Sequence, residues 1–228
     1  MANKLNESIE KIVREAQEKG ISVTADELMK IVKTHSAGTA ASAMISGAFP
    51  GVGTAVTMGI EIGFVWSMYY RICTKLGISV KKELIKSLGS AIVTNIAKLV
   101  ATQIVAGTVL SIIPGIGTAG AVAVWGLMAY SITYYSSIIF MNLLIRVFKA
   151  GKSIDQYSEE ELKHMMKQES EATSFREVKQ EAKQAFKERK ADGVAEVIED
   201  ETSDVPIPTR PEHAYWLHTG IDFGSTNS

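Results

Sequence analysis

Two long stretches without formal charge constrain this chain more than any other feature. Residues 36–60 and residues 99–145 contain no Asp, Glu, Lys or Arg over 25 and 47 positions. A helix needs about 20 apolar residues to cross the hydrocarbon core of a bilayer, so the longer stretch has room for two passes. The polar residues of 119–145 lie on every side of a helical wheel, without the single polar stripe of a water-facing helix. The composition of this region therefore suits lipid better than water.

The two stretches contain an internal repeat at a spacing of 64 residues, centred on FPGVGT and IPGIGT. Proline ends an incoming helix, and glycine permits positive φ, so both segments suit a reversal of the chain. The sequence predicts two apolar helical hairpins inserted in a membrane. Their predicted turn residues are Pro50, Gly51 and Gly53 in the first hairpin and Pro114, Gly115 and Gly117 in the second.

The first stretch is rich in small residues. Gly, Ala, Ser and Thr make up 17 of its 25 positions, and such residues let helices approach closely in lipid. Gly59 and Gly63 have the GxxxG spacing and are predicted to pack helices together. Glu61 lies between them, and burial of an unpaired carboxylate is costly. We expect Glu61 to pair with Lys98, and the alternative is that Glu61 lines a polar pore.

Positive charges flank the hairpins, whereas both Pro-Gly segments are uncharged. Residues 36–150 hold eight Lys or Arg against two acids. Because positive residues stay on the cytoplasmic side, this pattern predicts an inner (cytoplasmic) membrane protein with both termini cytoplasmic. The helix from Lys33 to Pro50 would be only about 25 Å long, at the lower edge of a full span. The sequence leaves open whether the hairpins cross the bilayer or wedge into one leaflet.

The sequence predicts an all-α fold in four segments. Residues 1–35 are amphipathic helices, 36–150 the membrane domain, 151–191 soluble charged helices, and 192–228 a flexible acidic tail with a terminal hydrophobic peptide. Capping boxes, in which a Ser or Thr and a Glu satisfy each other's backbone amides, are expected at Thr24–Glu27, Ser158–Glu161 and Ser174–Glu177. The apolar stripes of residues 158–191 suit a partner or self-association.

Several function classes are disfavoured by the composition. A net charge of −1 and a pI near 6.4 argue against nucleic-acid binding. Cys73 is the one cysteine, and the four histidines are too dispersed to suggest a metal site. The GxGxxG in GIGTAG lacks the preceding strand and the later acid of a dinucleotide site, so we interpret it as a turn. We expect no enzyme activity and no cofactor.

Residues 43–148 resemble the YcjF-like family, a domain of unknown function found beside or fused to bacterial GTPases. The resemblance rests on FPGVGTAV, MYYRICTKLGISV, LIKSLGSAIVTNIAKLV and IIPGIGTAGAV. It implies a helical, membrane-associated module that works with a GTPase, and it transfers no catalytic residue. The chain contains no GxxxxGK[ST] phosphate loop of its own.

Residues 220–228, GIDFGSTNS, look like the first phosphate loop of the actin and heat-shock-chaperone ATPases. In that superfamily the acid matching Asp222 lies near the metal, and the Gly-Ser-Thr turn faces phosphate. None of the superfamily's other nucleotide-binding elements follows in this sequence. We therefore interpret the match as chance similarity, with a remnant or docking peptide as the alternative.

Three functional hypotheses remain. The first is a non-enzymatic membrane protein, forming a homo-oligomer, that anchors, scaffolds or remodels the lipid bilayer and recruits a cytoplasmic partner, a GTPase by analogy, through residues 158–228. The second is an oligomeric pore or channel. The third is a soluble α-helical interaction or regulatory domain with an unusually apolar core.

Overall fold

The computed structural model describes residues 3–47, 54–106 and 118–191, with side chains described for 3–44, 59, 61–96 and 126–188. The described residues are helical without any strand, which confirms the predicted all-α class. The elements are α1 (Lys4–Glu18), α2 (Ala25–Gly47), α3 (Thr54–Lys75), α4 (Lys82–Ala106), α5 (Thr118–Lys149), η2 (Ile154–Gln156), α6 (Glu159–Ala172) and α7 (Phe175–Ala191).

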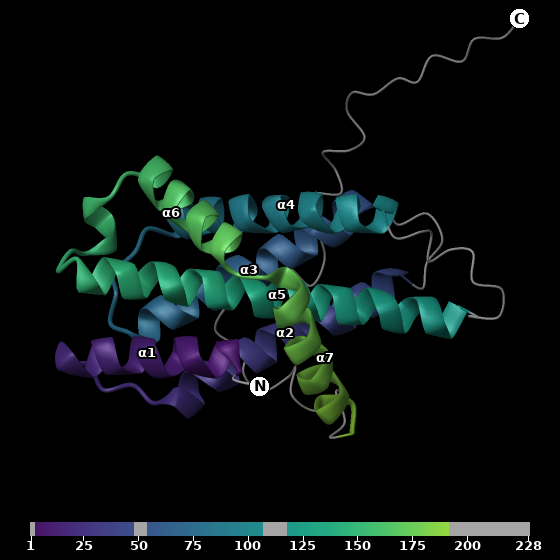
Figure 1. The fold of residues 1–228 in the computed structure, drawn as a ribbon, viewed down its shortest axis with the longest axis horizontal. Helices are drawn as coiled ribbons and strands as arrows, with labels where there is room; N and C mark the ends of the chain where they lie inside the picture. Colours follow the sequence, from purple (N-terminus) through teal and green to yellow (C-terminus); the bar gives the residue numbers. More distant parts are fainter. Residues whose placement is uncertain (1–2, 48–53, 107–117, 192–228) are drawn as a thin grey trace, which may run out of the picture.

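The four long helices, α2 to α5, run alternately in opposite directions (Figure 1). Close contacts fix their pairing: Gly38 of α2 lies against Phe64 of α3, and Gly89 of α4 lies against Trp66 of α3. In the same way Met44 of α2 lies against Gly126 of α5. One end of the bundle, here called the distal end, is where α2 and α4 finish and α3 and α5 begin. The opposite end is called the base.

Packing between the long helices extends across the two predicted hairpins. The interface of α2 with α5 is the most extensive in the described structure, and α4 rests mainly on α3 rather than on α5. The repeated hairpins therefore remain a prediction as structural units. All six predicted turn residues lie outside the described residues: Pro50, Gly51, Gly53, Pro114, Gly115 and Gly117.

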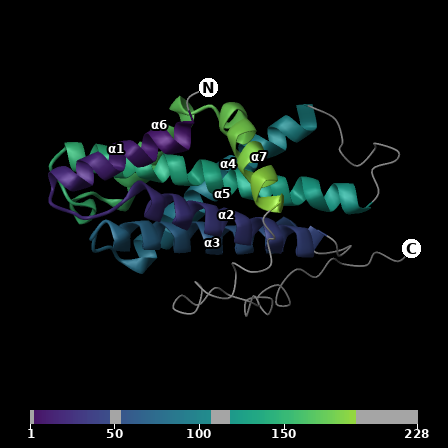
Figure 2. The same cartoon turned by 90° about the horizontal axis from the view of Figure 1, so that it is seen from below.

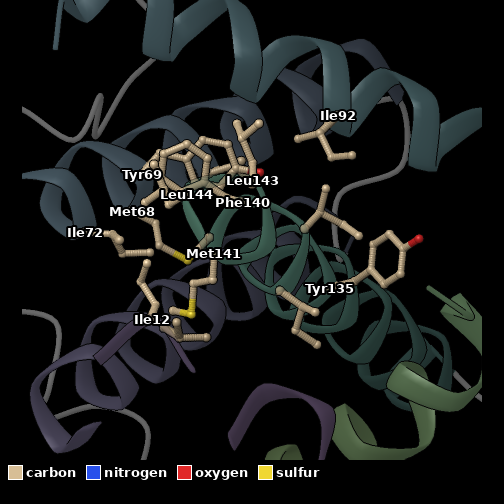
Figure 3. Packing of buried hydrophobic residues seen from close by; sticks show 14 of the residues in the cluster. Ile12, Met68, Tyr69, Ile72, Ile92, Tyr135, Phe140, Met141, Leu143 and Leu144 are labelled. Atoms are coloured by element: carbon tan, nitrogen blue, oxygen red, sulfur yellow. The ribbon is translucent and has the colours of Figure 1, made fainter. Parts of the chain in front are cut away.

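The core is built around α5. Every side chain from residue 129 to residue 141 is buried. The ring of Phe140 stacks on Tyr69 of α3, with centroids 3.9 Å apart and planes inclined by 9°, and both rings are fully buried (Figure 3). Aliphatic residues of α1, α3 and α4 surround this pair, so helices far apart in the sequence share one hydrophobic core.

The three shorter helices cover the base half of the bundle. Figure 2 shows α1 and α6 beside this half of α5, with α7 crossing near the middle of the helix. The amphipathic face predicted for α1 packs inward through Leu5, Ile9 and Ile12, which are at most 1% exposed. Helix α1 therefore uses its apolar face inside the chain.

Capping interactions set several helix starts as the sequence predicts. The backbone N–H of Thr24 donates to Glu27 Oε2 at 3.0 Å, and the N–H of Glu27 donates to Thr24 Oγ1 at 3.3 Å. Ser158 and Glu161 exchange the same two bonds at 2.8 and 3.2 Å. At Ser174 only the bond from the N–H of Glu177 forms, because the Glu177 carboxylate pairs with Lys4 instead.

Candidate membrane-facing end and buried polar seam

Helix α5 is the one helix among the described residues that is long and apolar enough to cross a membrane. Its qualifying segment is Gly126–Lys149, and 89% of the 18-residue apolar window within that segment is buried inside the protein. The core helix of a soluble protein has the same length and composition, so this segment is weak evidence of a span. The sequence predicts that residues up to 145 face lipid, whereas the structure buries every side chain of 129–141 and most of those of 142–148, because α1, α2, α3, α6 and α7 pack around this part of α5.

Most of the described aromatic residues of α3 and α5 belong to the core. Tyr69, Tyr134 and Tyr135 are at most 1% exposed, and each hydroxyl has a hydrogen-bond acceptor: Tyr69 donates to Ser136 O at 3.0 Å, for example. Trp66 and Tyr70 differ, because both are half-buried on the side of α3 that meets α4. Each carries an ammonium group from α4 over its ring. Lys86 Nζ lies 5.1 Å from the Trp66 centroid, and Lys82 Nζ lies 5.5 Å from that of Tyr70.

A set of hydrogen-bonded polar side chains lies between α2, α3 and α5. We call His35, Thr39, Ser67 and Thr133 the polar seam. Nε2 of His35 lies 3.4 Å from Ser67 Oγ, and Thr133 donates to Thr39 at 2.9 Å. Buried polar groups of this kind are stable when they bond to one another. The sequence alone does not reveal the seam, because Ser67 and Thr133 lie 28 to 98 residues from the α2 pair His35 and Thr39 and no local spacing links the three helices.

The His35–Ser67 contact has the residue types of a nucleophile and its base, but its geometry is structural. A catalytic pair needs access for substrate and a group that orients the imidazole. His35 is 4% exposed and Ser67 2%, and Nδ1 of His35 lies 2.7 Å from the backbone oxygen of Ile31 in its own helix. The contact therefore joins α2 to α3, and the described residues also contain no group of three metal-ligating side chains.

Glu61 is buried, with 5% of its surface exposed, and its Oε1 atom has no hydrogen-bond partner among the described residues. The side chain of Lys98, its predicted partner, lies outside them. The ion pair therefore stays a prediction. Such burial requires a partner or a neutral carboxyl group, because an isolated charge is expensive in a low-dielectric interior.

Close helix contacts form at glycines other than the predicted pair Gly59 and Gly63, whose packing role stays a prediction. A Cβ atom at Gly38 would lie 2.5 Å from Phe64 Cε1, and one at Gly126 would clash with Met44 Cε. At Gly59 an added Cβ would meet no described atom within 4 Å, and Gly63 is buried. Gly59 therefore forms no close helix contact within the described chain. The signal that pointed to Gly38 was present in the sequence, since small residues fill positions 36–43.

The base carries ion pairs between neighbouring helices. Lys75 of α3 lies 3.0 Å from Glu27 of α2, and Arg146 of α5 lies 3.1 Å from Glu169 of α6. The Lys75 ammonium group and the Thr24 cap lower the pKa of Glu27 below its ordinary value. At the same end, burial raises the pKa of the Cys73 thiol to about 12, so this one cysteine is a poor nucleophile near neutral pH.

The narrow apolar stripes of α6 and α7 are buried. Leu162, Met166, Phe175, Val178 and Ala182 are at most 4% exposed. The sequence predicts that these stripes meet a partner or a second copy of the chain, whereas they pack within the chain, where α5 supplies most of their contacts. Their outer faces are charged and exposed.

Comparisons with known proteins add no further assignment. No protein-family model matches the chain, and no curated protein or solved structure is similar to it. The resemblances of residues 43–148 to the YcjF-like family and of residues 220–228 to a phosphate loop remain expectations from the sequence.

Proposed function

We propose that this protein is a non-enzymatic membrane anchor whose distal end wedges into one leaflet while its base stays in the cytoplasm as a scaffold. One observation carries the proposal: all four long helices extend past the region that α1, α6 and α7 cover, and all four extend at the same end (Figure 1). In these distal parts of the helices the charged residues are Lys98 of α4 and, at the border of the covered region, the buried Glu61 of α3. A sparsely charged helical end opposite a charged base is the arrangement that a bilayer stabilises.

The length of the extension favours a wedge over a crossing. Helix α7 meets α5 at Tyr130, and α5 begins at Thr118. These 12 residues of helix span about 18 Å, compared with about 30 Å for the full hydrocarbon core and half of that for one leaflet. A full crossing would draw the charged helix α7 into the hydrocarbon, at a high cost in free energy.

The base is the part available to a cytoplasmic partner. Because the apolar stripes of α6 and α7 are used internally, a partner would contact the charged outer faces of these helices or the segment 192–228, which lies outside the described residues. A GTPase is the partner that the family resemblance implies. Assembly into a homo-oligomer belongs to the same proposal, and the open position at Gly59 offers a contact for it.

Flotation with phospholipid vesicles followed by alkaline extraction tests the anchor. We expect the full chain to float with vesicles and to resist extraction, because the distal end is held by acyl chains rather than by charge. Recovery of the protein in the soluble fraction after both steps would reject insertion.

Labelling of single cysteines at positions 51 and 115 then separates a wedge from a crossing. The native Cys73 is buried and has a raised pKa, so it contributes little background to thiol labelling. For a one-leaflet wedge we expect protection of both sites from membrane-impermeant reagents added on either side. Reactivity from the outer side would indicate crossing, and reactivity from the cytoplasmic side at both sites would reject insertion.

A second candidate is a soluble helical interaction domain, and the burial of α5 is the observation that favours it. Sedimentation of the purified chain in detergent-free buffer distinguishes the two. The anchor is expected to aggregate or to need detergent, whereas the soluble domain would sediment as a compact monomer. For the pore hypothesis, the α5 hydroxyls of Ser131, Thr133, Ser136 and Ser137 are bonded inside the chain and supply no water-facing lining.

A further inference from the structure

Helix α7 divides its surface into three sectors. At 100° per residue, Phe175, Val178, Ala182 and Phe186 form an apolar stripe. One side of this stripe is acidic, and the other side is basic. The acidic flank consists of Glu177, Glu181 and Glu188, and the basic flank consists of Arg176, Lys179, Lys183 and Lys187.

The apolar stripe fixes α7 across α5. The ring of Phe175 meets Tyr135 edge-on at 5.2 Å, and the ring of Phe186 meets Tyr130 at 5.4 Å. Phe175 and Phe186 are 11 positions apart in α7, whereas the two tyrosines they meet are five positions apart in α5. Helix α7 therefore crosses α5 at a steep angle, as Figure 1 shows. With this crossing one flank of α7 faces the base and the other faces the distal end.

Contacts with α1 show which flank faces the base. Lys4 Nζ lies 2.5 Å from Glu177 Oε2, and the backbone N–H of Lys4 donates to both carboxylate oxygens of Glu181, at 3.1 and 3.0 Å. Helix α1 then continues along the base half of α5, where Ser8 donates to Asn142 and Glu15 pairs with Lys149. The acidic flank therefore lies against α1 on the base side.

The basic flank consequently faces the distal end. Arg176, Lys183 and Lys187 are exposed and Lys179 is partly exposed, and none of the four forms an ion pair within the part of the chain that the structure describes. Four cations on one exposed flank lower the free energy of a nearby layer of negative charge. The flank also lies about 18 Å along α5 from Thr118, close to the depth of one leaflet.

We propose that the basic flank of α7 binds the headgroups of anionic phospholipids at the membrane surface, beside the point where the distal end enters the bilayer. The inference rests on the proposed membrane anchor and adds its lipid preference. Insertion supplies the uncharged contact with acyl chains, and the basic flank selects a negatively charged surface and sets the depth at which insertion stops.

The test compares two variants of the full chain with equal charge change. The first replaces Lys179, Lys183 and Lys187 with Gln. The matched control replaces Lys11, Arg14 and Lys167 with Gln, which are exposed on α1 and α6 in the base half. Gln has nearly the helix propensity of Lys and Arg, so both variants should keep their helical circular dichroism. Binding is measured with vesicles of neutral phosphatidylcholine and with vesicles containing phosphatidylglycerol, at low and high salt.

We expect the unmodified chain to bind phosphatidylglycerol vesicles more tightly than neutral ones, and salt to reduce the difference. Each lysine near a charged surface contributes about fivefold to binding, so the α7 variant should lose on the order of 100-fold on anionic vesicles at low salt. Its binding to neutral vesicles should stay unchanged, and the control should lose far less. Equal losses in both variants, or binding that does not depend on lipid charge, would overturn the inference. Failure of the unmodified chain to bind either vesicle would instead reject the anchor.

Discussion

The two halves of the bundle share an apolar composition but differ in what surrounds them. In the base half, most side chains of α5 are buried by the other helices, and its serine hydroxyls bond within the chain. Toward the distal end the same helix continues beyond α1, α6 and α7 (Figure 1). An uncharged stretch therefore does not by itself indicate that a helix contacts lipid. What decides its surroundings is whether the rest of the chain supplies helices to cover it.

Replacement of Phe140 by Ala removes a central ring of the core in the base half and should have the largest effect on stability. The ring is fully buried against Tyr69, so its loss leaves a cavity and should cost about 3–5 kcal/mol in the free energy of unfolding. Urea unfolding monitored by circular dichroism measures this loss. The partly exposed Leu84 of α4 is the control, since its truncation should cost much less. Equal losses would mean that α5 is not the centre of the core.

A charged residue placed at the distal end tests whether this end contacts lipid. Asp in place of Val52, between the glycines of the first Pro-Gly segment, should weaken vesicle binding by roughly 100-fold if the position reaches the hydrocarbon, since burial of Asp there costs about 2.5–3.5 kcal/mol. Flotation measures the effect. Asp at the exposed base residue Gln17 should leave binding unchanged. Unchanged binding of the Val52 variant would remove that segment from the membrane.

Two glycine variants compare Gly38, which lies against a neighbouring helix, with Gly59, which has no described neighbour. Ala at Gly38 would place its Cβ 2.5 Å from the Phe64 ring and should cost about 1–3 kcal/mol in the free energy of unfolding. Ala at Gly59 meets open space and should raise helix stability by up to about 1 kcal/mol. Thermal unfolding in detergent measures both. Destabilisation at Gly59, accompanied by loss of chemical crosslinking between copies, would show that Gly59 packs against a second chain.

The smallest expected effect concerns the cap of α6. Ala at Ser158 removes a cap and should cost about 1 kcal/mol at neutral pH. The cap lowers the pKa of Glu161 below its ordinary value of 4.5, so its contribution is complete above that pH and is lost as the pH falls through the lowered value. The two unfolding curves should therefore draw closer between pH 7 and pH 3 without meeting, because protonation of Glu161 removes the bond it accepts from the Ser158 hydroxyl, whereas the bond from the Glu161 N–H to Ser158 Oγ does not titrate. A difference that grows as the pH falls would contradict this account.

Local features of the fold could be predicted from the sequence because they depend on neighbouring residues. The caps at Thr24 and Ser158 form as predicted, and Gly20 ends the first helix with a φ of 76°. The amphipathic helices expected in residues 1–35 and the apolar stripes expected in residues 158–191 also form, in α1, α6 and α7. Their partner was wrong for α6 and α7, because these stripes meet α5 through contacts that link distant parts of the chain, and no local pattern specifies such contacts.

The candidate site was predictable in part. The burial of Glu61 could be expected from its apolar neighbours, whereas the polar seam required His35 and Thr133 to be brought together by folding. Ser and Thr on every side of α5 were interpreted as the absence of a polar stripe. In the structure they bond to backbone oxygens and to one another, so a helix that is polar in patches fits a protein interior as well as lipid.

The covering of α5 by α6 and α7 has a consequence for synthesis. Both helices follow α5 in the chain, so about 40 further residues must be translated before the cover is complete. At about 5–20 residues per second this takes about 2–8 s, during which the apolar segment of α5 has left the ribosome but the helices that cover it have not. If the protein is the membrane anchor proposed above, a nearby bilayer and the unfinished protein would compete for α5 in that interval.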